Sequence, residues 1–71
     1  MKNRLEELRN QRGWTQQELA DQVEVSRQTI ISLENGRYNP SILLAFRLAK
    51  IFSVTIEQLF LYSEETDHGQ Q

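Results

Sequence analysis

The sequence predicts an all-α fold of about five helices, joined by short turns into one small domain. Three observations support this. Apolar residues recur three and four positions apart, as on the buried face of a helix. No stretch alternates apolar and polar residues as a half-buried strand does. Each apolar segment after the first follows a residue suited to capping a helix, and these residues are Thr15, Ser26, Ser41 and Thr55.

The first helix is expected over 3–12, a segment rich in strong helix formers that stops at Gly13. The second begins at Thr15, because Glu18 three residues later completes a capping box in which each residue satisfies the other's backbone amide. It ends before Glu24. Leucines 5 and 8 of the first helix and Leu19, Ala20 and Val23 of the second are expected in the core.

Ser26 opens a short third helix that closes at Asn35, where an Asn-Gly pair marks a turn. Pro40 favours extended geometry before it, and Ser41 caps a fourth helix that runs to about Phe52. This helix is hydrophobic on more than one side, so we expect it to be central. Its apolar residues are Leu43, Leu44, Ala45, Phe46, Leu48, Ala49, Ile51 and Phe52.

Thr55 caps a last short helix whose Ile56, Leu59 and Phe60 face inward. From Ser63 the chain is polar, acidic and rich in glutamine, which is typical of disorder. The expected organisation is a domain over 1–62 and a disordered acidic tail over 63–71.

Charge and composition exclude several classes of protein. The 71 residues carry a net charge of -2, but residues 1–61 hold eight Lys and Arg against seven Asp and Glu, and the tail holds the other three acids. A body of +1 predicts only modest non-specific affinity for DNA. No apolar stretch reaches the roughly 18 residues that a membrane span needs, and the first residues do not form an apolar leader, so we expect a cytoplasmic protein.

Catalytic and metal-binding chemistry finds no support in the sequence. The chain has no cysteine, and its one histidine, His68, lies in the acidic tail without other ligands at metal spacing. The serines and threonines fall at predicted caps with no histidine nearby to act as a base, and no glycine-rich phosphate loop is present. We therefore expect neither an enzyme nor a cofactor or metal.

The segment 16–34 carries the functional signal. Two short helices joined by a turn of three or four residues form a helix-turn-helix, which lays its second helix into the major groove of DNA. On that helix, the side away from the apolar residues carries side chains that can hydrogen-bond to base edges or phosphates. They are Arg27, Gln28, Thr29 and Ser32. Taken alone, such a face could equally be an ordinary solvated surface.

The segment 16–37, within the pattern "TQQELA...VSRQTI..LENGR..PS", resembles the lambda-repressor-like Cro/repressor (XRE) family, and the similarity extends from about Leu5 to near Phe60. The resemblance implies a compact five-helix fold and a transcriptional regulator, expected to be a repressor, that binds palindromic operator DNA as a homodimer. We expect no small-molecule effector. A protein-interaction module, such as an antitoxin or adaptor, is the alternative.

The resemblance also implies roles for individual residues. Arg27, Gln28 and Ser32 occupy base-facing positions, with Thr29 beside them. Arg9 and Glu34 match a structural ion pair. Contacts to DNA phosphates are implied for Gln16, Asn35 and Arg37, and the helix starts at Thr15 and Ser41 could add backbone amides.

Two positions depart from the family pattern. Glu24 and Ser53 stand where the family often has glycine, so each is strained if its backbone takes a positive φ. Ile31 either touches a thymine methyl or packs beside Leu33 and Tyr38, while Trp14 is expected to be a core or hinge anchor and is assigned no site. The dimer seam is expected in an apolar run at the end of the domain, consisting of Ile56, Leu59, Phe60, Leu61 and Tyr62.

Overall fold

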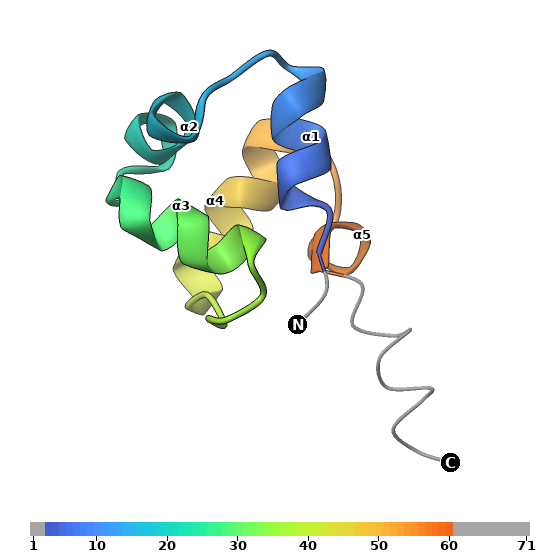
Figure 1. Ribbon diagram of the computed structural model, residues 1–71. Helices are drawn as coiled ribbons and strands as arrows, with labels where there is room; N and C mark the ends of the chain where they lie inside the picture. Colours follow the sequence, from blue (N-terminus) through green and yellow to red (C-terminus); the bar gives the residue numbers. More distant parts are fainter. Residues whose placement is uncertain (1–2, 61–71) are drawn as a thin grey trace.

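The computed structural model describes residues 3–60, and these form five helices and no strand (Figure 1). This confirms the predicted all-α class. The tail over 63–71 and the candidate dimer residues Leu61 and Tyr62 lie outside the described residues. The helices are α1 (Leu5–Gln11), α2 (Gln16–Val23), α3 (Arg27–Glu34), α4 (Ile42–Phe52) and α5 (Ile56–Phe60).

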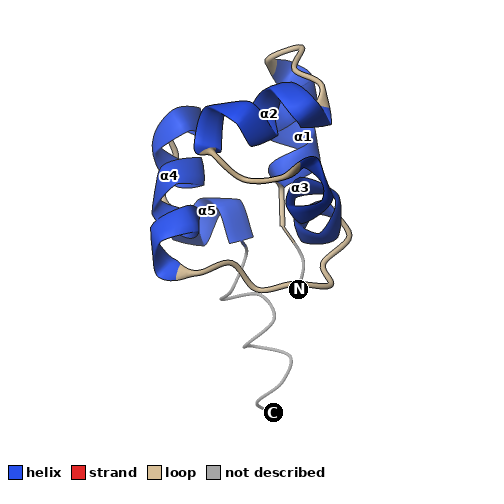
Figure 2. Ribbon diagram, turned by 90° about the vertical axis from the view of Figure 1, so that its left-hand side faces the viewer, coloured by secondary structure: helices blue, strands red, loops and turns tan. Residues whose placement is uncertain are grey.

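One apolar core holds all five helices together. Figure 2 shows α3 and α4 on opposite sides of the domain; α2 packs chiefly on α3, and α5 packs on α4. Trp14 lies against this core, its ring 5.5 Å from that of Phe52. The core residues are Leu5, Leu8, Leu19, Ala20, Val23, Ile30, Leu33, Leu44, Ala45, Leu48, Phe52, Leu59 and Phe60.

The helix starts follow the predicted caps. The side-chain oxygens of Thr15, Ser26 and Ser41 accept hydrogen bonds from backbone amides in the first turns of α2, α3 and α4. Thr15 and Glu18 form the expected capping box. Thr55 and Gln58 exchange the same pair of bonds at the start of α5. Each cap satisfies amides that would otherwise lack a partner, which fixes where the helix begins.

The first helix starts later than predicted. Asn3 lies before it, where its Oδ1 accepts from the amide of Leu5 at 2.9 Å and its Nδ2 donates to the carbonyl of Leu33 at 2.7 Å. The backbone amide of Arg4 donates to the carbonyl of Leu59 at 2.8 Å. Asn3 and Arg4 therefore connect the segment before α1 to the ends of α3 and α5. Helix propensity depends on local sequence and cannot predict such contacts.

The expected dimer seam is wrong for two of its members. Leu59 and Phe60 are 0% and 1% exposed within the single chain, so neither is available at a surface. The prediction assumed that a short helix could not bury its whole apolar run. However, α5 packs on α4 and is tied to the chain start through Leu59, which places both side chains in the core.

None of the helices in 3–60 is long and apolar enough to cross a membrane.

Two helices end in a left-handed turn at a residue that has a Cβ. Glu24 has φ 64° after α2, and Ser53 has φ 57° after α4. In both turns the next residue closes the end of the helix: Val25 donates to the Ala20 carbonyl and Val54 to the Ala49 carbonyl, each at 3.0 Å. Glycine is the usual residue at this position, because a Cβ in left-handed geometry crowds the backbone.

Replacing Ser53 by glycine should therefore stabilise the protein. We expect Ser53→Gly to raise the free energy of unfolding by about 1 kcal/mol, measured by urea denaturation. Ser53→Ala is the matched control, since it removes the hydroxyl but keeps the Cβ. If the alanine variant gained as much as the glycine variant, relief of backbone strain would not be the cause.

Candidate nucleic-acid interface

The surface of interest is built by α2, the turn over 24–26 and α3. Ala20 is fully buried where α2 meets α3, and a small side chain at that position lets the two helices approach closely. Glu24 in left-handed geometry turns the chain, and Ser26 caps the next helix. The result is two short helices joined by a tight turn, the geometry expected of a helix-turn-helix.

Burial on one side of α3 determines which residues face outward. Ile30 and Leu33, three residues apart, are fully buried. Arg27 and Gln28 are exposed, and the other outward-facing residues are half-buried. Those residues are Thr29, Ile31 and Ser32. The four polar residues assigned to base reading thus lie on the surface of one helix whose opposite side is fixed in the core.

A shallow open depression of about 230 Å³ lies along this side of α3. Its lining includes hydroxyl and amide groups, and the hydroxyl oxygens of Ser26 and Thr29 are 3.0 Å apart. Its lining includes Tyr38, a half-exposed aromatic from the loop after α3 that the sequence analysis did not assign to the site. The sequence feature that could have identified Tyr38 is the presence of an aromatic residue inside a polar loop. The lining residues are Ser26, Gln28, Thr29, Ser32 and Tyr38.

Two cations flank α3. Arg27 begins the helix and Arg37 follows its end, where the Arg37 amide donates to the Ser32 carbonyl at 3.0 Å. Both side chains are exposed, and neither has an ion-pair partner within residues 3–60. Asn35 is the C-cap of α3. Two guanidinium groups that are not engaged by protein carboxylates can meet anionic groups such as phosphates.

A largely buried polar network positions α3 against α1 and α2. Arg9 of α1 reaches Glu34, the last residue of α3, with 2.7 Å between Nε and Oε2 and 3.3 Å between Nη2 and Oε1. A third donor of Arg9, Nη1, holds the carbonyl of Trp14 at 2.8 Å. The hydrogen bond to Glu34 raises the pKa of Arg9, and the charge attraction adds to it, against the lowering effect of burial.

Gln16 belongs to the same network. Its Nε2 donates to Glu34 Oε1 at 3.1 Å, which links the first turn of α2 to the end of α3. An amide nitrogen has two hydrogens, so one remains for a further acceptor. Because Glu34 directly precedes Asn35, its bond to Gln16 also places Gln16 near Asn35 at the end of α3. The other phosphate candidates, Thr15 and Ser41, cap the starts of α2 and α4.

Breaking the Arg9–Glu34 pair should be costly, because the two side chains are only 11% and 5% exposed. We expect Glu34→Leu to lower the free energy of unfolding by about 2–4 kcal/mol, between the values for exposed and fully buried pairs. Arg9→Met combined with Glu34→Leu should lose less than the sum of the two single changes. Urea denaturation of the four proteins measures this coupling.

Arg4→Ala is the control, since its partner Glu7 forms a solvent-exposed pair with it and little change is expected. Strictly additive losses in the Arg9 and Glu34 series would contradict a coupled network.

The fold and this surface define a helix-turn-helix DNA-binding protein. The family model for the helix-turn-helix (HTH_3, Cro/C1-type) matches residues 5–59. The chain belongs to this lambda-repressor-like Cro/C1-type family of DNA-binding transcriptional regulators.

Individual relatives agree with that assignment. The chain is 48% identical over 70 residues to an HTH-type transcriptional regulator of Archaeoglobus fulgidus, covering 99% of this chain and 100% of the relative. It is 49% identical over 65 residues to one from Methanocaldococcus jannaschii, covering 92% and 98%. The crystal structure of the clp gene regulator ClgR from Corynebacterium glutamicum shares the fold, with a TM-score of 0.72 at 24% identity over 93% of this chain and 70% of that one.

A further relative has a name that states its direction of control. It is the competence pilus inhibition repressor of Acinetobacter baylyi, 46% identical over 63 residues, which cover 86% of this chain and 56% of the repressor.

Proposed function

We propose that the protein is a sequence-specific repressor that binds a palindromic operator as a homodimer and inserts the helix over 26–35 into the major groove of each half-site. One observation carries this proposal. The polar residues of α3 face outward because Ile30 and Leu33 lock its other side into the core. A polar helix face held rigidly on a helix-turn-helix is the element that reads base edges.

Base reading would fall to four side chains with different chemistry. An arginine such as Arg27 suits the O6 and N7 acceptors of guanine, and a glutamine such as Gln28 suits N6 and N7 of adenine. The hydroxyls of Thr29 and Ser32 can donate or accept. Thr29 already shares its hydroxyl with Ser26, so Ser32 is the less committed of the two.

Phosphate contacts would hold α3 in register, chiefly from its C-terminal end. Near the C-terminal end of α3 lie Gln16, Asn35 and Arg37; further amide donors come from the helix starts at Thr15 and Ser41. Tyr38, beside Gln28 and Ser32 in the same depression, adds an aromatic surface and a hydroxyl that we assign to the DNA contact.

A homodimer suits a domain this small and this weakly charged. With a charge of only +1 over residues 1–61, non-specific attraction to DNA is weak, so affinity must come from specific contacts. Two copies on half-sites about 34 Å apart double those contacts. Repression would follow from occupying promoter DNA in the cytoplasm, where the chromosome lies, and the relative that is named as a repressor supports this direction of control.

Selection of bound sequences from a random duplex pool at fixed, moderate salt tests the proposal. The 71-residue chain should enrich a palindrome. Arg27→Ala or Gln28→Ala should each weaken binding to it by about 1–3 kcal/mol, or about 5- to 150-fold, and relax the preference at one position of each half-site. Gln11→Ala, an exposed glutamine of α1 outside the interface, should bind as the wild type does.

Arg27→Lys separates two effects. It keeps the positive charge but loses the two-pronged guanidinium, so it should lose discrimination more than non-specific binding. If nothing is enriched, and binding to the pool is the same with and without the Arg27 and Gln28 side chains, the proposed function is wrong.

A further inference from the structure

The N-terminal half of α4 presents an apolar surface that nothing in residues 3–60 covers. Ile42, Leu43 and Phe46 are 84%, 58% and 59% exposed. Apart from Tyr38 beside α3, they are the large exposed apolar side chains of the described residues. Residues four apart on a helix share a face, so Ile42, Phe46 and Lys50 form one stripe along α4.

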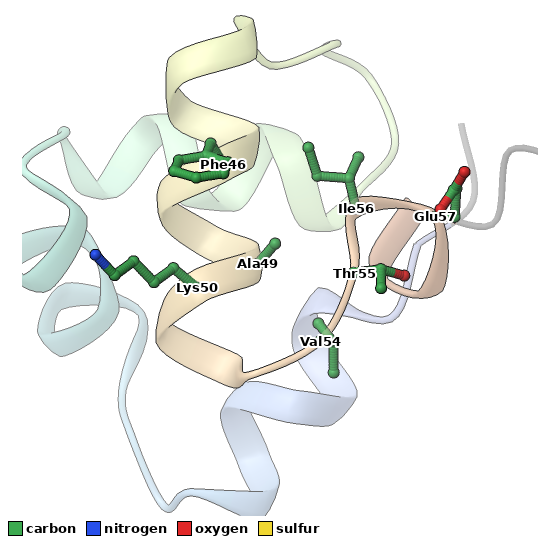
Figure 3. Close-up of a pocket in the computed structure, with 7 residues that line it drawn as sticks. All are labelled: Phe46, Ala49, Lys50, Val54, Thr55, Ile56 and Glu57. Carbon is green, nitrogen blue, oxygen red and sulfur yellow. The ribbon is translucent and has the colours of Figure 1, made fainter.

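This stripe borders an apolar groove of about 840 Å³ between α4 and the start of α5 (Figure 3). Phe46 stands at one side, Ile56 lies across from it, and Ala49 lies between them. Small Ala49 leaves room that a larger side chain would fill. The lining residues are Phe46, Ala49, Lys50, Val54, Thr55, Ile56 and Glu57.

The two ends of the groove carry opposite charges. Figure 3 shows Lys50 extending from α4 on one side and Glu57 on α5 on the other. Neither forms an ion pair with another residue of the described chain. A two-fold axis that lies in the plane of the interface, at right angles to the line from Lys50 to Glu57, would bring each Lys50 towards the partner's Glu57. The surface is therefore complementary to itself, as a two-fold interface requires.

We infer that this face, formed by Ile42, Leu43, Phe46, Lys50, Ile56 and Glu57, is the seam between two copies of this chain. The inference rests on the proposed function, because it assigns the surface through which the operator-bound dimer forms. In this arrangement Phe46 of each copy enters the groove over Ala49 of the other, and two Lys50–Glu57 pairs flank the apolar contact. Of the run expected from the sequence, this seam keeps Ile56 and leaves out Leu59 and Phe60, which are buried within the chain.

Two other occupants fit less well. The segment 63–71 has no apolar side chain to fill the groove, and its three carboxylates would add negative charge beside Glu57. DNA also fits less well, because its phosphates gain nothing from apolar walls and are repelled by Glu57, so that the single cation Lys50 offers little net attraction. The face also lies away from α3: α4 and α3 occupy opposite sides of the domain in Figure 2, so dimerisation leaves the polar face of α3 free.

A few side chains on each copy make a small interface, so the dimer should be weak in solution and favoured on DNA by mass action. Sedimentation equilibrium of the 71-residue chain over a range of concentrations should show monomers and dimers. Phe46→Ala should raise the dissociation constant by about tenfold or more, because a central aromatic side chain dominates a contact of this kind.

Tyr38→Ala is the matched control. It also removes an exposed aromatic, but outside the groove, and should leave the dissociation constant unchanged. Thermal unfolding checks that both variants stay folded, which the exposure of both rings favours.

Charge exchange tests the two-fold arrangement directly. Lys50→Glu alone leaves two acidic groups at each groove, and Glu57→Lys alone leaves two basic groups, so each variant should associate less than the wild type. An equal mixture should recover association, because in a mixed pair every acidic group meets a basic one. Recovery in the mixture is not expected for a partner of any other kind.

The inference is overturned if the chain does not self-associate either free or on the selected DNA, if Phe46→Ala associates as the wild type does, or if the mixture fails to recover. Sequence selection separates these failures from that of the proposed function. An enriched sequence with no effect of the groove variants refutes only the seam. Association that follows the predicted pattern without any enriched sequence refutes only operator binding.

Discussion

Burial of Ile30 and Leu33 is the constraint on which the rest of the interface depends. These two side chains fix the rotation of α3 about its own axis, and that rotation alone decides which residues face outward. A rotation of α3 by one residue, about 100°, would turn Arg27 and Gln28 away from their present direction and move Ile30 and Leu33 out of the core. The network of Arg9, Gln16 and Glu34 adds a second constraint, because it ties the end of α3 to α1 and α2. Packing sets the rotation of α3, and the polar network secures its end.

The same core leaves two outward faces with different chemistry. Along α3 the outer side chains are polar, with cations at both ends, whereas the outer stripe of α4 is apolar. Placing them on opposite sides of the domain keeps a protein contact from competing with a DNA contact. Because the body is almost neutral, the α3 face of one copy is expected to bind DNA weakly, and the α4 face is expected to associate weakly because it is small. Coupling between dimer formation and DNA binding would then make occupancy depend steeply on protein concentration.

The sequence predicted those features that depend on local chemistry. The caps at Thr15, Ser26, Ser41 and Thr55 could be recognised because capping needs one side-chain oxygen at one place. The inward-facing residues of each helix could also be predicted, because apolar residues recur there at helical spacing. The left-handed geometry of Glu24 and Ser53 was not predicted; resemblance to a family that often has glycine there raised it only as a condition, because nothing in these side chains themselves indicates a positive φ.

Features that depend on contacts between distant segments were missed. Asn3 was wrongly assigned to the first helix. Its side chain instead bonds to Leu33, thirty positions away, and local sequence does not reveal such a contact. Leu59 and Phe60 were expected to face inward and also to belong to the dimer seam, because one short helix was not expected to bury the whole apolar run. Only the packing of α5 on α4 shows that a single chain buries both side chains. Tyr38 was not assigned because only the folded loop brings it beside Gln28 and Ser32. Gln16 was expected to meet phosphate, and its bond to Glu34 depends on how α2 meets α3.

The central claim is that α3 is the surface that meets DNA. The most direct test is to follow backbone amide chemical shifts by NMR while a selected duplex is added to isotope-labelled protein. The account predicts that the largest changes fall on residues 26–41 and at the start of α2, with smaller changes along α4 and at the start of α5 where DNA favours the dimer, and with Gln11 and the rest of α1 little affected. Changes centred on α1, or spread evenly over the domain, would contradict it.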